Sequence, residues 1–423
     1  EVVSGLDGFD VAITKFSADG SKRLYATYLG GGGNEQPHSM VVDKNGDLVV
    51  AGRTSSPDFP VTAPVYGTGG RNDIFISKIS ADGSRLLASR KFGGTGDDGV
   101  NIADKEVAVS SGNVSTRRNY GDDARSEVIV DNNNNIYLAS CTQSGAFPVT
   151  AGAFQKTFGG GLQDGVLIKT SPGLSTVLFS SYLGGAGNDA AFVLSLNPFT
   201  NNIYVGGGTA SNNMPGTGGN TGPILLSNYG GGETDGFISI ISNDGSQLIK
   251  TCYAGANGND IVYGVQFDKF GFPYMTGTTS VALPVINAAF NTQRNGKQFI
   301  TKMQPDLSGV VYSTNFGKGQ GSPDLSITAF LVDRCENVYV AGWGGGIDNG
   351  YPNAGTNGLS VTSDAIRNFT DGSDFYFFVL EKNALSQLYG SFFGNDDRGL
   401  TQLIGDHVDG GTSRFDKEGV IYE

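Results

Sequence analysis

The sequence predicts an all-β fold, a β-propeller of four-stranded antiparallel blades. Short apolar runs of about five residues recur along the whole chain, and tight turns rich in Asp, Asn and Gly separate them. No segment of useful length has apolar residues at helical spacing. Short strands repeated around an axis are typical of a propeller, whereas solenoid repeats are shorter and more even. The composition shows no break that would mark a linker, so we predict a single domain over residues 1–423.

Composition and charge narrow the class of protein further. The chain has 423 residues, 38% of them hydrophobic, which is enough to bury a sizeable core. Its formal net charge of −13 argues against nucleic-acid binding, which needs clusters of Lys and Arg. No apolar run approaches the roughly twenty residues of a membrane helix, so we expect no membrane insertion. Cys141, Cys252 and Cys335 lie far apart in no C-x-x-C pattern, so a zinc cluster or a disulfide framework is not expected, and whether any two of them pair stays open.

The repeat is clearest in residues 126–185, where four predicted strands, here called a to d, follow one another. Versions of all four recur along the chain. The a strands end at Asp43, Asp131, Asn197, Asp268, Asp333 and Asp416, and the b strands cover 48–52, 136–140, 203–207, 274–277, 338–342 and 420–422. The c strands begin near Phe9, Asp73, Gly165, Gly236, Gln298 and Phe375, and the d strands end at Leu29, Phe92, Leu183, Tyr253, Phe316 and Phe393.

Six strands of each type predict six blades. The chain opens with c and d strands and closes with a and b strands, so we expect one blade to be assembled from both ends, which removes exposed sheet edges. If flanking residues belong to the protein, each end is half of its own blade and the number becomes seven. We interpret the chain as a piece of a larger multidomain protein.

The lengths of the connections predict where binding occurs. The a–b and c–d turns are short, as at 44–47 and 80–84, and in a four-stranded meander they share one face. Every long connection joins b to c or d to a, so all of them share the other face, here called the long-loop face. They are 53–72, 95–125, 208–234, 343–373 and 394–411. Loops on a rigid scaffold are where binding residues usually lie, and the insertions 95–125 and 343–373 depart most from the repeat.

The repeat resembles the SBBP family of β-propeller repeats. The matching elements are Val-Asp-x-x-x-Asn-Ile-Tyr-Val-Ala-Gly, in variant form at 130–139 and in full at 332–342, Phe-Pro-Val-Thr followed by Ala-Phe at 147–154, and Tyr-Leu-Gly-Gly at 28–31 and 182–185. Residues 407–416 also resemble large secreted proteins of Bacteroidota that carry a gliding-motility-associated C-terminal sorting domain. The resemblance implies type IX secretion, an extracellular or cell-surface location and no known catalytic residues.

Carboxylates at the d–a connections are the first candidate ligand-binding residues. They are Asp97, Asp98, Asp189, Asp260, Asp396 and Asp397. Converging near the axis of the long-loop face, they could bind calcium or sugar hydroxyls. The alternative, which the recurrence of the motif favours, is that each carboxylate caps its own turn. Because Asp43–Asp47 has its Gly too early for a calcium loop and lacks the bidentate Glu, we predict no metal site and no cofactor.

Departures from the repeat supply the remaining candidates. Asp122 and Asp123 lie in the first insertion, and Trp343 and Tyr351 lie in the second. An exposed Trp343 would suit stacking on a sugar, and burial at the end of its strand is the alternative. His38 and His407 are the only histidines, so a Ser-His-Asp triad stays open, although no Gly-x-Ser-x-Gly elbow is present.

These observations favour a non-enzymatic module for adhesion or assembly that binds protein or polysaccharide through the long-loop face. The expected partners are other surface-protein domains or polysaccharide. Two alternatives remain: a carbohydrate-active hydrolase or lyase with an axial acidic site, and a structural spacer in a surface filament. Two carboxylates facing each other across an open axial cleft would favour the enzyme, and a closed axis would argue against it.

Overall fold

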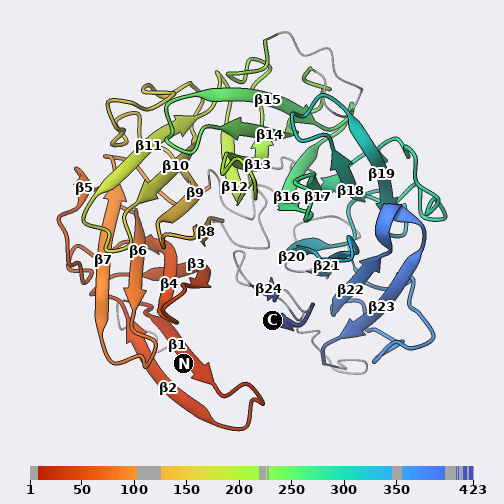
Figure 1. Cartoon of the computed structure of the whole chain (residues 1–423), viewed down its shortest axis with the longest axis horizontal. Helices are drawn as coiled ribbons and strands as arrows, with labels where there is room; N and C mark the ends of the chain where they lie inside the picture. Colours follow the sequence, from red (N-terminus) through yellow and green to blue (C-terminus); the bar gives the residue numbers. More distant parts are fainter. Residues whose placement is uncertain are drawn as a thin grey trace.

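The computed structural model describes residues 8–101, 125–218, 225, 228–344, 355–395, 406, 408, 413–416 and 419–422. In this part of the chain the regular structure is β-sheet, apart from the short 3-10 helix η3 (Lys382–Ala384). The sheets stand around a common axis as the blades of a propeller, so the predicted fold class is confirmed (Figure 1).

Five blades are complete. Blade 1 contains β3 (Glu35–Val42), β4 (Leu48–Thr54), β6 (Asp73–Ile79) and β7 (Leu86–Gly93), with β5 (Tyr66–Gly67) added parallel to β7. Blade 2 contains β8 (Glu127–Val130), β9 (Ile136–Thr142), β10 (Asp164–Thr170) and β11 (Val177–Leu183). Blade 3 contains β12 (Asp189–Leu196), β13 (Ile203–Thr209), β14 (Asp235–Ile241) and β15 (Leu248–Ala254). Blade 4 contains β16 (Asp260–Phe267), β17 (Pro273–Thr279), β18 (Gln298–Met303) and β19 (Val310–Phe316). Blade 5 contains β20 (Ser326–Val332), β21 (Val338–Trp343), β22 (Phe375–Leu380) and β23 (Gln387–Phe393).

The strands of the sixth repeat form two separate sheets. β1 (Val11–Phe16) pairs with β2 (Arg23–Leu29), and β24 (Arg414–Phe415) pairs with β25 (Ile421–Tyr422). All four predicted strand types are therefore present, but in the described residues they do not join into the continuous closing blade that we expected. The pairing of β24 with β25 is only two residues long, which leaves few backbone groups to extend the sheet towards β1.

The first strand of each complete blade lies nearest the axis, and the fourth lies at the rim (Figure 1). In four of the blades this inner strand carries a bulge at the same place, between Pro37 and Ser39 in blade 1 and between Ala191 and Val193 in blade 3, for example. A bulge bends the strand and increases its twist, so its recurrence fits the inner strands to the crowded centre of the ring.

The core lies between neighbouring blades. Every residue of β6, β10 and β14, the third strands of blades 1 to 3, is buried, because both faces of such a strand are covered by the adjacent blades. Hydroxyl pairs satisfy the polar side chains there: Ser77 bonds to Ser89 at 2.8 Å, and Ser239 bonds to Thr251 at the equivalent place at 2.8 Å.

The short a–b turns are held by their own side chains. Asp43 Oδ1 accepts the amides of Asn45 (2.8 Å) and Asp47 (3.1 Å), and Asp43 Oδ2 lies 2.6 Å from Lys78 Nζ. These contacts make residues 43–47 a structural turn.

Candidate functional site

The d–a carboxylates lie at the junctions between blades. Asp98 is fully buried and accepts hydrogen bonds from the Gly94 amide (2.8 Å), Ser144 Oγ (3.1 Å) and Thr142 Oγ1. It therefore ties the turn that enters blade 2 to the end of β9. Burial is the main cause that raises the pKa of Asp98, to about 7.

The next repeat has the same arrangement, and the repeat after it keeps the bond to the backbone amide but leaves Asp260 Oδ1 without a hydrogen-bond partner. Asp189 is fully buried and accepts the Gly185 amide (2.7 Å), Ser211 Oγ (2.8 Å) and Thr209 Oγ1. Asp260 is fully buried and accepts the Ala256 amide at 2.9 Å. Burial raises the pKa of each to about 6. These contacts are those of turn caps, so none of the three carboxylates is free to meet a ligand at the axis.

Asp97 is partly buried and pairs with a neighbouring side chain. Arg71 Nε donates to Asp97 Oδ1 at 3.0 Å, and Arg71 Nη2 forms an ion pair with Asp97 Oδ2. This arginine lowers the pKa of Asp97. The remaining candidates, Asp122, Asp123, Tyr351, Asp396 and Asp397, lie outside the described residues and stay predictions.

Trp343 is part of the core. Its side chain is 1% exposed at the end of β21, and its indole Nε1 donates to Val408 O at 3.2 Å. The ring therefore cannot stack on a sugar. It is buried at the end of its strand, which was the second of the two interpretations of the sequence.

His38 is buried between blades 1 and 2. Its Nδ1 lies 3.0 Å from Ser126 Oγ, and that hydroxyl lies 2.6 Å from Ser140 Oγ. Burial is the main cause that lowers the pKa of His38 to about 3, so the ring is neutral. The contacts on the Nδ1 side of His38 are hydroxyls, and the nearby charge that lowers its pKa is that of Arg53. The described residues therefore do not assemble a Ser-His-Asp triad at His38. His407 lies outside the described residues.

The axis is crossed by an arginine that the sequence prediction did not include. Arg125 precedes β8 in blade 2, and its guanidinium donates to Tyr263 O (2.8 Å) in blade 4 and to Ile327 O (3.3 Å) in blade 5. Its Cζ lies 5.0 Å from the centroid of the Tyr263 ring, an arrangement that favours cation–π attraction. Burial lowers the pKa of Arg125 to about 9, which leaves it charged at neutral pH.

A second arginine approaches the axis from β24. Arg414 donates to Ser39 Oγ of blade 1 at 2.7 Å, to Val128 O of blade 2 at 3.2 Å, and pairs with Glu127 at 3.2 Å. A cavity of about 200 Å³ lies between the two arginines and the inner strands. Its charged lining is therefore two arginines and Glu127, and not the acidic cluster that the sequence suggested.

One signal could have identified Arg125. Six residues before the end of the a strand, the repeats have Pro37, Ala191, Val262 and Ile327, and at that position blade 2 has Arg125. A charged residue at an otherwise apolar inward position is a departure from the repeat, although it lies at the edge of the first insertion.

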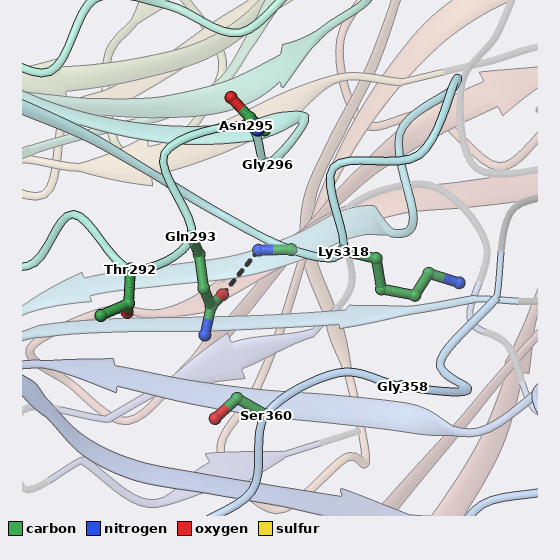
Figure 2. Close-up of a pocket in the computed structure, with 8 residues that line it drawn as sticks. Thr292, Gln293, Asn295, Gly296, Lys318, Gly358 and Ser360 are labelled. Carbon is green, nitrogen blue, oxygen red and sulfur yellow. Dashed lines mark hydrogen bonds between the residues drawn. The ribbon is translucent and has the colours of Figure 1, made fainter.

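The long-loop face carries a polar pocket of about 270 Å³ between blades 4 and 5 (Figure 2). Three connections line it: the b–c connections of both blades and the d–a connection between them, which are the two kinds of connection that share the long-loop face. The lining residues are Thr292, Gln293, Asn295, Gly296, Gly317, Lys318, Gly358 and Ser360. They contribute hydroxyl, amide and ammonium groups but no carboxylate, imidazole or thiol.

Two contacts order this pocket. Gln293 Oε1 accepts the Gly317 amide at 2.8 Å, which joins two of the connections (Figure 2). Lys318 Nζ donates to Gly355 O at 2.7 Å and lies 3.3 Å from Asp324 Oδ1. An ammonium has three N–H donors, so these contacts leave Lys318 one donor for a bound molecule.

Metal-binding chemistry is sparse in the described part of the chain. No group of three or more His, Cys, Asp or Glu residues that could hold a metal ion is found there.

Cys141 and Cys252 are buried free thiols, and Cys335 is an exposed free thiol, so none of the cysteines pairs with another. Within the described ranges, no helix combines the length and the hydropathy needed to cross a bilayer.

Comparisons with known proteins show similarity of fold only. No protein family matches the sequence, and no curated protein sequence matches it. A protein of unknown function from Bacteroides caccae is 10% identical, covers 94% of each chain and has a TM-score of 0.40. An ulvan lyase of polysaccharide lyase family PL25 is 10% identical, over 86% of this chain and 69% of the lyase, with a TM-score of 0.35. The NanB sialidase of Streptococcus pneumoniae is 8% identical, over 90% of this chain and 62% of the sialidase, with a TM-score of 0.41.

At these identities and TM-scores, none of the three informs the chemistry of this chain. The fold and the contacts described above define the class: a β-propeller whose axis is crossed by arginines and whose long-loop face carries a polar pocket.

Proposed function

We propose that this chain is a non-enzymatic binding module of a secreted or cell-surface protein, and that it binds a polysaccharide in the pocket between blades 4 and 5. The pocket itself is the observation that carries the proposal. It lies on the long-loop face, and its lining consists of groups that hydrogen-bond to hydroxyls. The resemblance to SBBP repeats supports the extracellular location.

The chemistry of the pocket favours binding without reaction. Most enzymes that hydrolyse a glycosidic bond use a pair of carboxyl groups, one as acid and the other as base or nucleophile. The pocket lining has none, and at the axis Glu127 is paired with Arg414 at 3.2 Å. Lys318 is paired with Asp324 at 3.3 Å, so the pocket offers hydroxyl, amide and N–H groups with their charge balanced, which suits the hydroxyls of a sugar unit.

Binding to a glycan array, followed by calorimetry on the strongest polysaccharide, tests the proposal. Lys318→Ala and Gln293→Ala are each expected to weaken binding about tenfold, which corresponds to the loss of one charged or structural hydrogen bond. Lys269→Ala is the matched control, because Lys269 is exposed in an a–b turn on the opposite face.

The same samples distinguish the alternatives. Release of reducing ends or unsaturated sugars on incubation would show an enzyme. Binding that is equally strong in the Lys318→Ala and Lys269→Ala variants would place the ligand elsewhere. No binding to any glycan, together with self-association of the chain, would favour the structural spacer.

A further inference from the structure

Pairs of acidic side chains recur at the junctions between successive blades. One member lies at the start of the c strand of a blade, and the other lies in the d–a connection that follows or at the start of the next a strand. The pairs are Asp10 with Glu35, Asp73 with Asp98, Asp164 with Asp189, Asp235 with Asp260 and Asp374 with Asp406; the remaining junction has Gln298 with Asp324. The final Gly of the d strand separates the two members: a Cβ on Gly184 would lie 2.9 Å from Asp189 Oδ2 and still closer to Asp164 Oδ1.

In four of the five acidic pairs the first member uses one oxygen to hold the b–c connection; Asp10, the first member of the fifth pair, is exposed. Asp73 accepts the Gly70 amide at 2.9 Å, Asp164 accepts the Gly159 amide at 2.6 Å, and Asp374 accepts the Asp371 amide at 3.2 Å. Asp235 accepts the Gly230 amide in the same way. The junctions differ at the second oxygen.

Two junctions place a cation of the chain at this second oxygen. Lys91 Nζ lies 3.2 Å from Asp73 Oδ2, and Arg367 Nη1 lies 3.4 Å from Asp374 Oδ1. The junction with the neutral Gln298 also has a cation, because Lys318 Nζ lies 3.3 Å from Asp324 Oδ1. Each of these three junctions therefore carries at most one net negative charge.

The junctions on either side of blade 3 have no such cation. Asp164 Oδ1 and Asp235 Oδ1 are buried without a hydrogen-bond partner, and both residues are 0% exposed. The charged or titratable groups that face Asp164 are Asp189 and Tyr182, with Asp98 beyond the tyrosine. Those that face Asp235 are Asp260, Tyr229 and Tyr253, with Glu233 and Asp189 near the two tyrosines. All of these groups are acidic or neutral.

We infer that Asp164 and Asp235 are protonated in the folded protein, so that these two junctions also carry a single negative charge. Asp164 and Asp189 converge on Gly184, and the charge of Asp260 acts on Asp235, so the two buried carboxylates of either pair cannot both ionise without a large electrostatic cost. Blade 4 shows that the fold accepts a neutral hydrogen-bonding group here, because Gln298 stands at the equivalent position. Burial, the leading cause, raises the pKa of Asp164 and of Asp235 to about 7.

The consequence is that these two aspartates make the folded protein less stable as the pH rises, whereas an aspartate with a lowered pKa makes it more stable. A carboxyl whose pKa is raised from about 3.9 to about 7 binds its proton more tightly in the folded state than in the unfolded state. Stability is therefore greatest below about pH 4 as far as these two groups are concerned, and it falls as the pH rises from about 4 to about 7. Carboxylates with lowered pKa, such as Asp244 at about 2, lose their contribution only at more acidic pH.

Thermal unfolding of the Asp164→Asn/Asp235→Asn variant between pH 5 and pH 8, in EDTA, tests the inference. The wild type is expected to lose several degrees of unfolding temperature over this range. The variant is expected to lose much less and to exceed the wild type at pH 8, because its amides are neutral throughout. Asp73→Asn is the matched control and should lower the unfolding temperature at every pH, since it leaves Lys91 buried without its carboxylate.

Three results would overturn the inference. Equal pH slopes in the wild type and the variant would show that Asp164 and Asp235 are ionised. Calcium chloride that raises the unfolding temperature of the wild type but not of the variant would show that a metal ion supplies the missing charge. If the double variant does not fold, infrared difference spectra of the wild type decide instead: the absence of a protonated carboxyl band that disappears between pH 6 and pH 8 contradicts the proposal.

Discussion

Arg125 and Tyr263 join opposite parts of the ring at its axis: Arg125 Nη2 donates to Tyr263 O at 2.8 Å, and the guanidinium lies 5.0 Å from the centroid of the tyrosine ring. Arg125 precedes the inner strand of blade 2, and Tyr263 lies in the inner strand of blade 4. The contact therefore spans the centre and fixes the positions of blades that are not neighbours.

Arg125→Ala is expected to destabilise the fold by about 3 kcal/mol, because it removes two buried, charge-assisted hydrogen bonds that join blade 2 to blades 4 and 5. Urea unfolding followed by circular dichroism measures the change. Arg71→Ala is the control: the Arg71 side chain is 80% exposed, so its unfolding midpoint should match that of the wild type. Equal midpoints for both variants would contradict a structural role of Arg125.

Asp98→Ala is expected to cost about 3 kcal/mol of stability, since the Gly94 amide and the hydroxyls of Thr142 and Ser144 lose a buried acceptor. Polysaccharide affinity of the folded fraction should not change, because the carboxylate is 0% exposed. The adjacent Asp97→Ala serves as control and should shift the chemical denaturation curve much less, because Asp97 is partly exposed and its main partner is the exposed Arg71. A selective loss of binding in Asp98→Ala would restore the axial-site interpretation.

Trp343 is the only tryptophan, so its fluorescence reports its environment directly. Because the side chain is 1% exposed, emission should be blue-shifted, poorly quenched by iodide, and unchanged on addition of a bound polysaccharide. Trp343→Ala should destabilise the protein by about 3–5 kcal/mol through the cavity it leaves, whereas Trp343→Phe should cost less and keep the affinity for polysaccharide. Quenching of the native emission by a sugar ligand would contradict the buried placement.

The three thiols should differ sharply in reactivity. Cys335 is exposed, whereas Cys141 and Cys252 are buried, and burial raises the pKa of Cys252 to about 11 and that of Cys141 further. Ellman's reagent is therefore expected to titrate one thiol in the native protein and three in denaturant. A reducing agent should leave the unfolding temperature unchanged, and a drop in that temperature would reveal a disulfide.

The sequence predicted the scaffold because the information for it is local and repeated. Alternating apolar residues and turn-forming Asp, Asn and Gly set the strands and the short turns at each copy, and every predicted strand type is present in the structure. The assignment of the long connections to one face follows from strand order alone, and it identified the face on which the pocket of Gln293 and Lys318 lies.

The tertiary structure decided what the individual side chains do. Arg414 pairs with Glu127 across 287 positions of the sequence, and no local pattern specifies such a contact. The axis is consequently lined by arginines where the sequence suggested carboxylates. Asp98, Asp189 and Trp343 carry groups that suit a binding site, but burial and satisfied hydrogen bonds assign them to the scaffold. The repeat determined where the strands run, and only the packing of blades determined which charges meet, because charge pairing depends on residues far apart in the chain.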